Sequence, residues 1–239
     1  MTARKFMPEA TNEVKEFLNQ LIDPATDHTQ YRAAMYTLGR LLADAALSRI
    51  EPDKEICLAC TVEDADYLAK GLLDEIQKLR PSQPIRLACF WNKTTFEPFG
   101  CEEYEVAPII KTYQEPVKNK DCILIIVKSI ISGACVVATN ITSLISDLTP
   151  SRILVASPVM LDGAQQKLEH HFSAELVNRF EYIIFAVDNE NENGAVKPGV
   201  GGNVYQRYGW EGASDKNKAI PELVSARRKQ LIAEVKASG

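Results

Sequence analysis

The sequence predicts a three-layer α/β/α fold, in which helices cover both faces of a mainly parallel β-sheet. Short apolar segments alternate with longer segments of helical periodicity along most of the chain, which is typical of a parallel sheet. Residues 122–127 form an unbroken apolar run, as expected for a strand that is buried on both faces. Similar runs predict further strands at 56–60, 85–90, 152–156 and 182–187.

The predicted helices follow from apolar residues that recur at spacings of three and four. An N-terminal helix is expected at about 10–22, and residues 30–50 carry the strongest helical pattern in the chain. The remaining helical patterns cover 64–79, 134–147, 161–171, 173–179 and a tail at about 219–237, which Pro221 opens.

Residues 91–120 are rich in turn-forming residues and predict a small antiparallel β-arm around 104–106. A chain of 239 residues is long enough for one large α/β domain with a sizeable core. We therefore expect residues 1–239 to form a single domain that includes the N-terminal helix and the C-terminal helical tail.

Composition and charge exclude several classes of partner. Apolar residues make up 46% of the chain, the net charge is -5, and no basic stripe indicates binding to nucleic acid. No apolar run approaches the roughly 20 residues that span a bilayer, so no membrane association is expected. The N-terminus lacks the apolar core of a secretion signal, and we expect a cytoplasmic protein.

Neither the cysteines nor the histidines predict a metal site. Cys57 and Cys60 form a C-x-x-C motif, but the motif lies in a predicted strand, where residues three apart point to opposite faces. Free buried thiols are therefore expected. His170 and His171 fall at the end of a predicted helix, where solvated side chains are the usual state, and His28 is expected in a loop.

In open parallel sheets, ligands bind beyond the carboxyl ends of the strands. The loops after residues 60, 90, 127, 156 and 187 are therefore the candidate binding loops. After residue 127, small residues precede a predicted helix, and free backbone N–H groups with a helix dipole favour an anion there. This segment is either a phosphate loop or an ordinary strand-to-helix turn, and its small residues are Ser132, Gly133, Ala134 and Cys135.

Four segments carry a resemblance to a known family. Residues 31–45 match a long N-terminal helix, residues 90–98 a Tyr-Arg-Asp-x-x-Thr-Leu-x-Pro turn, and residues 125–135 a phosphoribosyl-pyrophosphate (PRPP) loop. Residues 191–201 match the pattern Asn-Glu-x-Gly-x-x-x-Pro-Gly-x-Gly. Over roughly 30–210 the chain resembles the uracil phosphoribosyltransferases.

The resemblance implies a phosphoribosyltransferase-like fold, a homodimer, and a family reaction in which uracil and PRPP form UMP with magnesium. The small-residue loop would hold the 5′-phosphate, while arginines and another strand-end loop would hold pyrophosphate. Backbone groups would read uracil in the loop that contains Val196, Pro198, Gly199, Val200 and Gly201.

The chain departs from the family pattern where pyrophosphate charge must be balanced. Glu63 stands where an arginine is expected, Trp91 and Asn92 replace the arginine and aspartate of the turn, and Val127 replaces an acidic residue. Gly202 replaces an aspartate. With Asp64 and Asp66 beside Glu63, we expect pyrophosphate to meet repulsion. Arg207 still resembles the family's arginine, and Lys93, Lys128 and Lys197 are candidate substitutes for the lost charge.

Three hypotheses remain open. A catalytically degenerate homologue would keep a uracil or nucleotide pocket and serve in regulation or assembly, as a homodimer or with an active relative. An active phosphoribosyltransferase with altered contacts or another base would need PRPP and Mg²⁺. An interaction protein with a closed former site would use the tail and the aromatic residues Tyr205, Tyr208 and Trp210, unless these pack on the domain. Asp188 follows the last strand and either lines the base pocket or is solvated.

Overall fold

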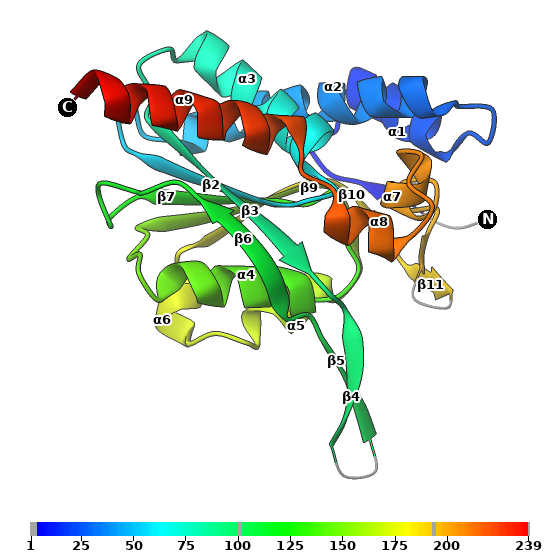
Figure 1. Ribbon diagram of the computed structural model, residues 1–239. Helices are drawn as coiled ribbons and strands as arrows, with labels where there is room; N and C mark the ends of the chain where they lie inside the picture. Colours follow the sequence, from blue (N-terminus) through cyan, green and yellow to red (C-terminus); the bar gives the residue numbers. More distant parts are fainter. Residues whose placement is uncertain (1–3, 100–101, 193–194, 239) are drawn as a thin grey trace.

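The sheet at the centre of the molecule is mixed but mainly parallel (Figure 1). The computed structural model describes residues 4–99, 102–192 and 195–238. In spatial order the strands are β1 (Lys5–Phe6), β10 (Phe180–Asp188), β9 (Arg152–Leu161), β7 (Ile123–Val127), β2 (Ile56–Thr61), β3 (Ile85–Asn92) and β6 (Ile109–Gln114). The five inner strands are parallel, whereas β1 and β6 pair antiparallel at the two edges. A short strand, β8 (Ile130–Ile131), also pairs with β9.

Helices cover both faces of this sheet (Figure 1). One layer contains α1 (Asn12–Ile22), α2 (His28–Ala46), α3 (Lys70–Leu79) and α9 (Glu222–Ser238), with the 3₁₀ turn Leu47–Arg49 after α2 and a π-helical turn, Ala65–Ala69, before α3. The other contains α4 (Cys135–Ile145), α5 (Ala164–Glu169) and α6 (Ala174–Val177). The predicted α/β class is therefore confirmed.

Each face of the sheet has its own apolar core. Successive side chains of a strand point to opposite faces, so they belong to the two cores in turn. Cys60 packs in the cluster beneath α2 and α3, whereas Cys57 packs in the cluster on the α4 side. The C-x-x-C residues thus point to opposite faces, as the sequence predicts. β7 is buried along its whole length because it lies between β2 and β9 and is covered on both faces.

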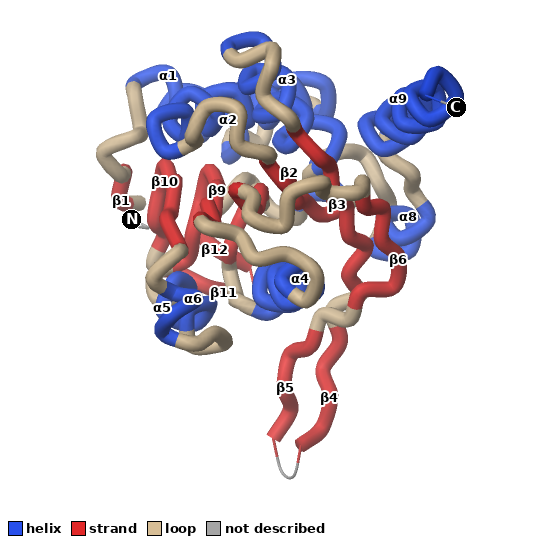
Figure 2. Tube along the Cα trace, turned by 90° about the vertical axis from the view of Figure 1, so that its left-hand side faces the viewer, coloured by secondary structure: helices blue, strands red, loops and turns tan. Residues whose placement is uncertain are grey.

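The predicted β-arm is a hairpin of β4 (Thr95–Phe99) and β5 (Glu102–Val106) that projects from the body (Figure 2). The segment after β10 contains a second small hairpin, β11 (Glu190–Glu192) and β12 (Ala195–Lys197). Two short helices, α7 (Val204–Arg207) and α8 (Ala213–Lys218), connect this segment to α9.

Three expectations about local structure are corrected. Strand β9 continues to Leu161 rather than ending at 156, because β8 pairs with its extra residues. His28 is the first residue of α2, and its Nδ1 lies 2.8 Å from the backbone oxygen of Arg207. Helix α8 was not predicted, because its six residues contain too few apolar positions for a periodic pattern. Within the described residues, no helix combines the length and apolar character needed to cross a bilayer.

Candidate functional site

The loops that follow β2 and β7 are joined by a buried ion cluster. Lys128 Nζ lies 3.0 Å from Glu63 Oε1 and 2.9 Å from Asp64 Oδ2. The three side chains are 12%, 13% and 0% exposed, respectively. Because β2 and β7 are parallel neighbours, their carboxyl ends meet, and the cluster occupies that edge of the sheet.

Asp64 also holds the backbone of the neighbouring loop. Its Oδ2 accepts a hydrogen bond of 2.8 Å from Thr61 Oγ1, and its Oδ1 accepts one of 3.2 Å from the Ser129 backbone N–H. Both carboxylate oxygens are therefore occupied within the protein. The cluster fixes the two loops relative to each other and leaves one negative charge in excess.

Glu63 and Lys128 remain ionised at neutral pH. Burial alone would raise the pKa of Glu63, but the charges of Lys128 and Lys216 outweigh it and lower that pKa to about 2. Burial alone would lower the pKa of Lys128, but Asp64 and Glu63 raise it above its usual value. The cluster is thus a salt bridge rather than a set of neutral groups.

Asp66, the third carboxylate of this segment, has a different role. Its Oδ1 accepts a 2.8 Å hydrogen bond from the backbone N–H of Leu223, in the first turn of α9. The three carboxylates therefore have partners within the protein: Glu63 and Asp64 share Lys128, and Asp66 anchors the start of α9. Repulsion of pyrophosphate stays a prediction.

Trp91 is buried and joins β3 to the C-terminal segment. Its side chain is 1% exposed, and its Nε1–H donates a 2.9 Å hydrogen bond to the backbone oxygen of Ala219, just before α9. The ammonium of Lys111 lies 4.8 Å from the centre of the indole ring. The residue at the position of the family's arginine therefore anchors the tail.

Asn92 has no free amide group for a ligand. Its Nδ2 donates to Asn140 Oδ1 at 2.9 Å and to the backbone oxygen of Ala107 at 3.0 Å. Asn140 Nδ2 returns a 3.2 Å hydrogen bond to Asn92 Oδ1. This buried amide pair connects the end of β3 to the middle of α4.

The small-residue loop precedes α4 as predicted, and Ser132 and Gly133 line a cavity of about 50 Å³ beside it. Lys128 and Glu105 also line this cavity. A Cβ placed on Gly133 would lie 3.4 Å from Glu105 Oε2, so a carboxylate of the β-arm lies close to the loop. Cys135 Sγ donates to the backbone oxygen of Glu105, and burial together with the Glu105 charge raises the Cys135 pKa. An incoming phosphate would meet this carboxylate.

Two other residues of the predicted phosphate site offer no ligand contact through a polar side chain. Ala134 is the N-terminal cap of α4 and is largely buried, at 6% exposure. Val127 ends β7 with 1% exposure, packed in the core on the α2 side of the sheet.

The loop that resembles the uracil loop is held from inside the protein. The buried carboxylate of Asp188 accepts 2.8 Å hydrogen bonds from the Gly199 backbone N–H and from the Arg4 guanidinium. The exposed fractions of the Arg4 and Asp188 side chains are 7% and 0%, so Asp188 is not solvated. Val200 accepts a 2.8 Å hydrogen bond from the buried Tyr31 hydroxyl through its backbone oxygen.

Gly201 lies against the end of α1. Its φ of +78° belongs to the left-handed region, and a Cβ added there would lie 2.0 Å from the Leu21 backbone oxygen. Of the remaining loop residues, Val196 is buried, Pro198 is half-buried and Gly202 is exposed. Lys197 lies 3.5 Å from Glu192 in an exposed ion pair, so it adds no charge to the cluster of Lys128.

The aromatic residues after the loop pack mainly on the body. Tyr208 is 1% exposed, and its ring centre lies 5.5 Å from that of Tyr31 and 4.7 Å from that of Tyr67. Trp210 packs against the same core. Arg207 Nη2 donates to the Leu21 backbone oxygen at 3.3 Å, so this arginine helps to hold the end of α1.

Sequence reasoning missed Arg4, Asn140 and Lys216. Arg4 belongs to an N-terminal segment without a recognisable pattern. The signal that could have identified it is Asp188, because a carboxylate buried at a strand end needs a cation beside it. Asn140 interrupts an apolar helical face, which is the signal that could have identified a buried polar pair. Lys216 lies on the unpredicted α8 and donates to the Asn92 backbone oxygen at 3.1 Å.

Solved structures share the fold at low sequence identity. The AQ2163 protein from Aquifex aeolicus matches with a TM-score of 0.61 and 15% identity, over 83% of this chain and 95% of that chain. Adenine phosphoribosyltransferase from Trypanosoma brucei, solved with AMP, pyrophosphate and ribose-5-phosphate, matches with a TM-score of 0.49 and 15% identity, over 79% of this chain and 86% of that chain. A hypothetical protein from Neisseria gonorrhoeae with bound ppGpp matches with a TM-score of 0.44 and 10% identity, over 66% of this chain and 80% of that chain.

No protein-family model and no curated protein matches the sequence. At such identities the likeness concerns the fold alone. The α/β fold, with a mainly parallel sheet, helices on both faces and small antiparallel hairpins, is shared with the AQ2163 protein. The likeness does not single out the uracil phosphoribosyltransferases.

Proposed function

We propose that this protein is a catalytically degenerate relative of the uracil phosphoribosyltransferases, which acts through binding in regulation or assembly rather than through turnover. The observation that carries the proposal is the buried cluster of Glu63, Asp64 and Lys128 at the carboxyl ends of β2 and β7. In the family that the sequence resembles, this edge of the sheet receives pyrophosphate.

Transfer from PRPP requires cations and dipoles that are available where pyrophosphate charge develops. Lys128 is engaged by two carboxylates, so an entering pyrophosphate would have to displace them. Leaving a buried charge without its partner costs about 3–5 kcal/mol, which corresponds to a loss in affinity of roughly 100-fold or more. The cluster therefore opposes PRPP binding by occupying the site.

Three further observations support the proposal. The indole N–H of Trp91 donates a hydrogen bond to the backbone before α9, and the side-chain amide of Asn92 is hydrogen-bonded to that of Asn140. The Glu105 carboxylate lies beside the small-residue loop, where a 5′-phosphate would need positive charge. At these positions the described side chains of Trp91, Asn92 and Glu63 all have partners within the protein.

In this proposal the protein binds its partners through exposed surfaces of the β-arm and of α9. The β-arm carries Phe96 with 66% exposure, and α9 carries Ile232 with 50% exposure. Exposed apolar side chains on projecting elements suit a second copy of the chain or an active relative as the partner. The homodimer and the heteromer are both compatible with this assignment.

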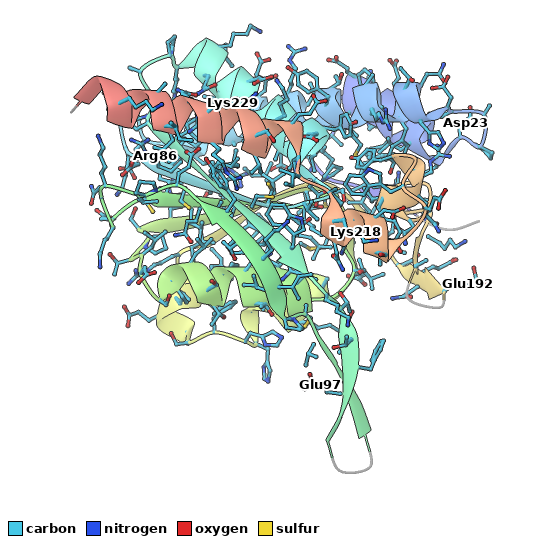
Figure 3. The ribbon with its side chains drawn as sticks, viewed as in Figure 1. Asp23, Arg86, Glu97, Glu192, Lys218 and Lys229 are labelled. Atoms are coloured by element: carbon cyan, nitrogen blue, oxygen red, sulfur yellow. The ribbon has the colours of Figure 1, made fainter. Side chains whose placement is uncertain are left out.

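The test is UMP formation from labelled uracil, PRPP and magnesium by the purified protein, with an active uracil phosphoribosyltransferase as the positive control. We expect no product, and no heat on titration of PRPP with magnesium. The Glu63→Gln variant, which partly releases Lys128, should bind PRPP more tightly than wild type. Glu97→Gln, on the exposed β-arm (Figure 3), is the control and should not. A turnover rate near that of the positive control would refute the proposal and favour an active enzyme with rebuilt contacts.

A further inference from the structure

A large cavity lies outside the small-residue loop. Its volume is about 520 Å³, and its walls are the turn after β3 and the segment from α7 to α8. The residues that line it are Asn92, Lys93, Thr94, Tyr205, Ser214, Lys216 and Asn217, with Ala213. None of them lines the 50 Å³ cavity beside the small-residue loop. A cavity of this size falls in the range of small-molecule sites.

The lining is positively charged in a protein of net charge -5. Lys93 and Lys216 contribute two ammonium groups, and none of the lining residues carries a carboxylate. Glu63 interacts with Lys216 from outside the lining, and Asp215, beside Lys216 in the sequence, accepts a 3.2 Å hydrogen bond from the Glu211 backbone. The two lysines of the lining favour an anion.

The walls of the cavity are held in place by buried contacts. Lys216 Nζ is positioned by the Asn92 backbone oxygen at 3.1 Å, and the Asn92 side chain is fixed by the amide pair with Asn140. Just after α8, the backbone oxygen of Ala219 accepts a hydrogen bond from Trp91. Figure 3 labels Lys218 on α8 and shows how this helix lies beside the strands at the base of the β-arm. A ligand would therefore meet a largely formed site, which lowers the entropic cost of binding.

Two further groups indicate what the rest of the ligand resembles. Asn217 Oδ1 is buried and has no hydrogen-bond partner in the structure, and a buried acceptor calls for a donor. Tyr205 contributes an aromatic ring to the lining, and aromatic faces stack on nucleobases. An anion that also carries a planar group with N–H donors would satisfy these two groups and the two lysines together.

We propose that this cavity binds a nucleoside monophosphate, with the phosphate between Lys93 and Lys216, the base against Tyr205, and an N–H of the base donating to Asn217. The site is built partly from α8 and does not depend on the small-residue loop. It is also independent of the proposed loss of catalysis, because a protein that forms no UMP can still bind a nucleotide here.

The test is isothermal titration of the full-length protein with UMP, AMP and GMP, with uridine and inorganic phosphate as probes of the two halves of the ligand. We expect at least one monophosphate to bind, and to bind more tightly than either probe. Lys93→Met should weaken it roughly tenfold or more, because a charge-assisted hydrogen bond is lost. Tyr205→Leu should weaken it about fivefold or more, because stacking is lost.

Lys93 is suited to this test because its side chain is exposed, so we expect the variant to fold like wild type. Within the part of the chain that the structure describes, neither Lys93 nor Lys118 forms an ion pair, and both are exposed. Lys118→Met, in the loop between β6 and β7, is therefore the matched control and should bind like wild type. The proposal is overturned if no monophosphate binds at millimolar concentration, if Lys93→Met and Lys118→Met bind equally well, or if phosphate alone binds as tightly as the nucleotides.

Discussion

Replacing Lys128 by methionine tests the ion cluster directly. The change keeps the length of the side chain but removes the charge that lies between Glu63 and Asp64. The two carboxylates are 13% and 0% exposed, so water cannot replace the ammonium without opening the loops. Removing one partner from a buried ion pair costs about 3–5 kcal/mol, and we expect the free energy of unfolding at pH 7 to fall by that amount.

The pH dependence provides an independent measure of the same cluster. The folded-state pKa of Glu63 lies at about 2, below its ordinary value of 4.5, which corresponds to about 3 kcal/mol. This stabilisation is present above pH 4.5 and is lost as the pH falls toward 2. In Lys128→Met the pKa of Glu63 is no longer lowered in this way. The difference in stability between wild type and variant should therefore narrow on acidification.

Urea unfolding at pH 7 and pH 4, followed by circular dichroism, measures both effects. Lys54→Met is the matched control, because Lys54 is 17% exposed but its partner Asp121, 3.2 Å away, is 59% exposed. A surface pair of this kind contributes about 1 kcal/mol or less. If Lys128→Met loses no more stability than Lys54→Met at pH 7, the cluster does not hold the two loops, and the argument against PRPP binding fails with it.

Three further substitutions test other contacts. Trp91→Phe removes the indole donor to the backbone before α9 and should lower the free energy of unfolding in urea by about 1–3 kcal/mol. Proteolysis of the tail should become faster, and unchanged cleavage would contradict the anchoring role. Asp188→Asn leaves Arg4 buried without its counter-ion and should cost about 3–5 kcal/mol; a loss below 1 kcal/mol would show that Arg4 finds another partner. Gly201→Ala forces a Cβ against the Leu21 backbone oxygen at positive φ and should lower the melting temperature by several degrees, which a thermal scan checks; a stable variant would mean that the end of α1 yields easily.

The layers of the fold could be predicted from sequence because they depend on local periodicity. The apolar run at β7 and the alternation of strands with helices both follow from which residues avoid water. The extension of β9 could not be predicted, because it depends on pairing with β8, more than twenty residues away. Helix α8 was missed because it is held by contacts with β3 rather than by an apolar stripe of its own.

The contacts among the candidate site residues could not be predicted from the sequence. The sequence placed Glu63, Asp64 and Lys128 at strand ends and predicted unbalanced negative charge. The balance itself depends on the side-by-side register of β2 and β7, which no single segment reveals. In the same way, the hydrogen bond from the Trp91 indole to the Ala219 backbone joins residues far apart in the sequence and could not be predicted.

The anchoring of α9 on Trp91 also gives the protein an optical reporter. The sequence contains two tryptophans. Trp91 lies in β3 and contacts the backbone before α9, and Trp210 lies between α7 and α8. The emission of an indole depends on the polarity of its surroundings and on nearby charge. Trp91 is buried away from solvent, with the Lys111 ammonium close to its ring. Release of the tail, or filling of the adjacent cavity, should therefore change the colour and intensity of the intrinsic fluorescence without any added label.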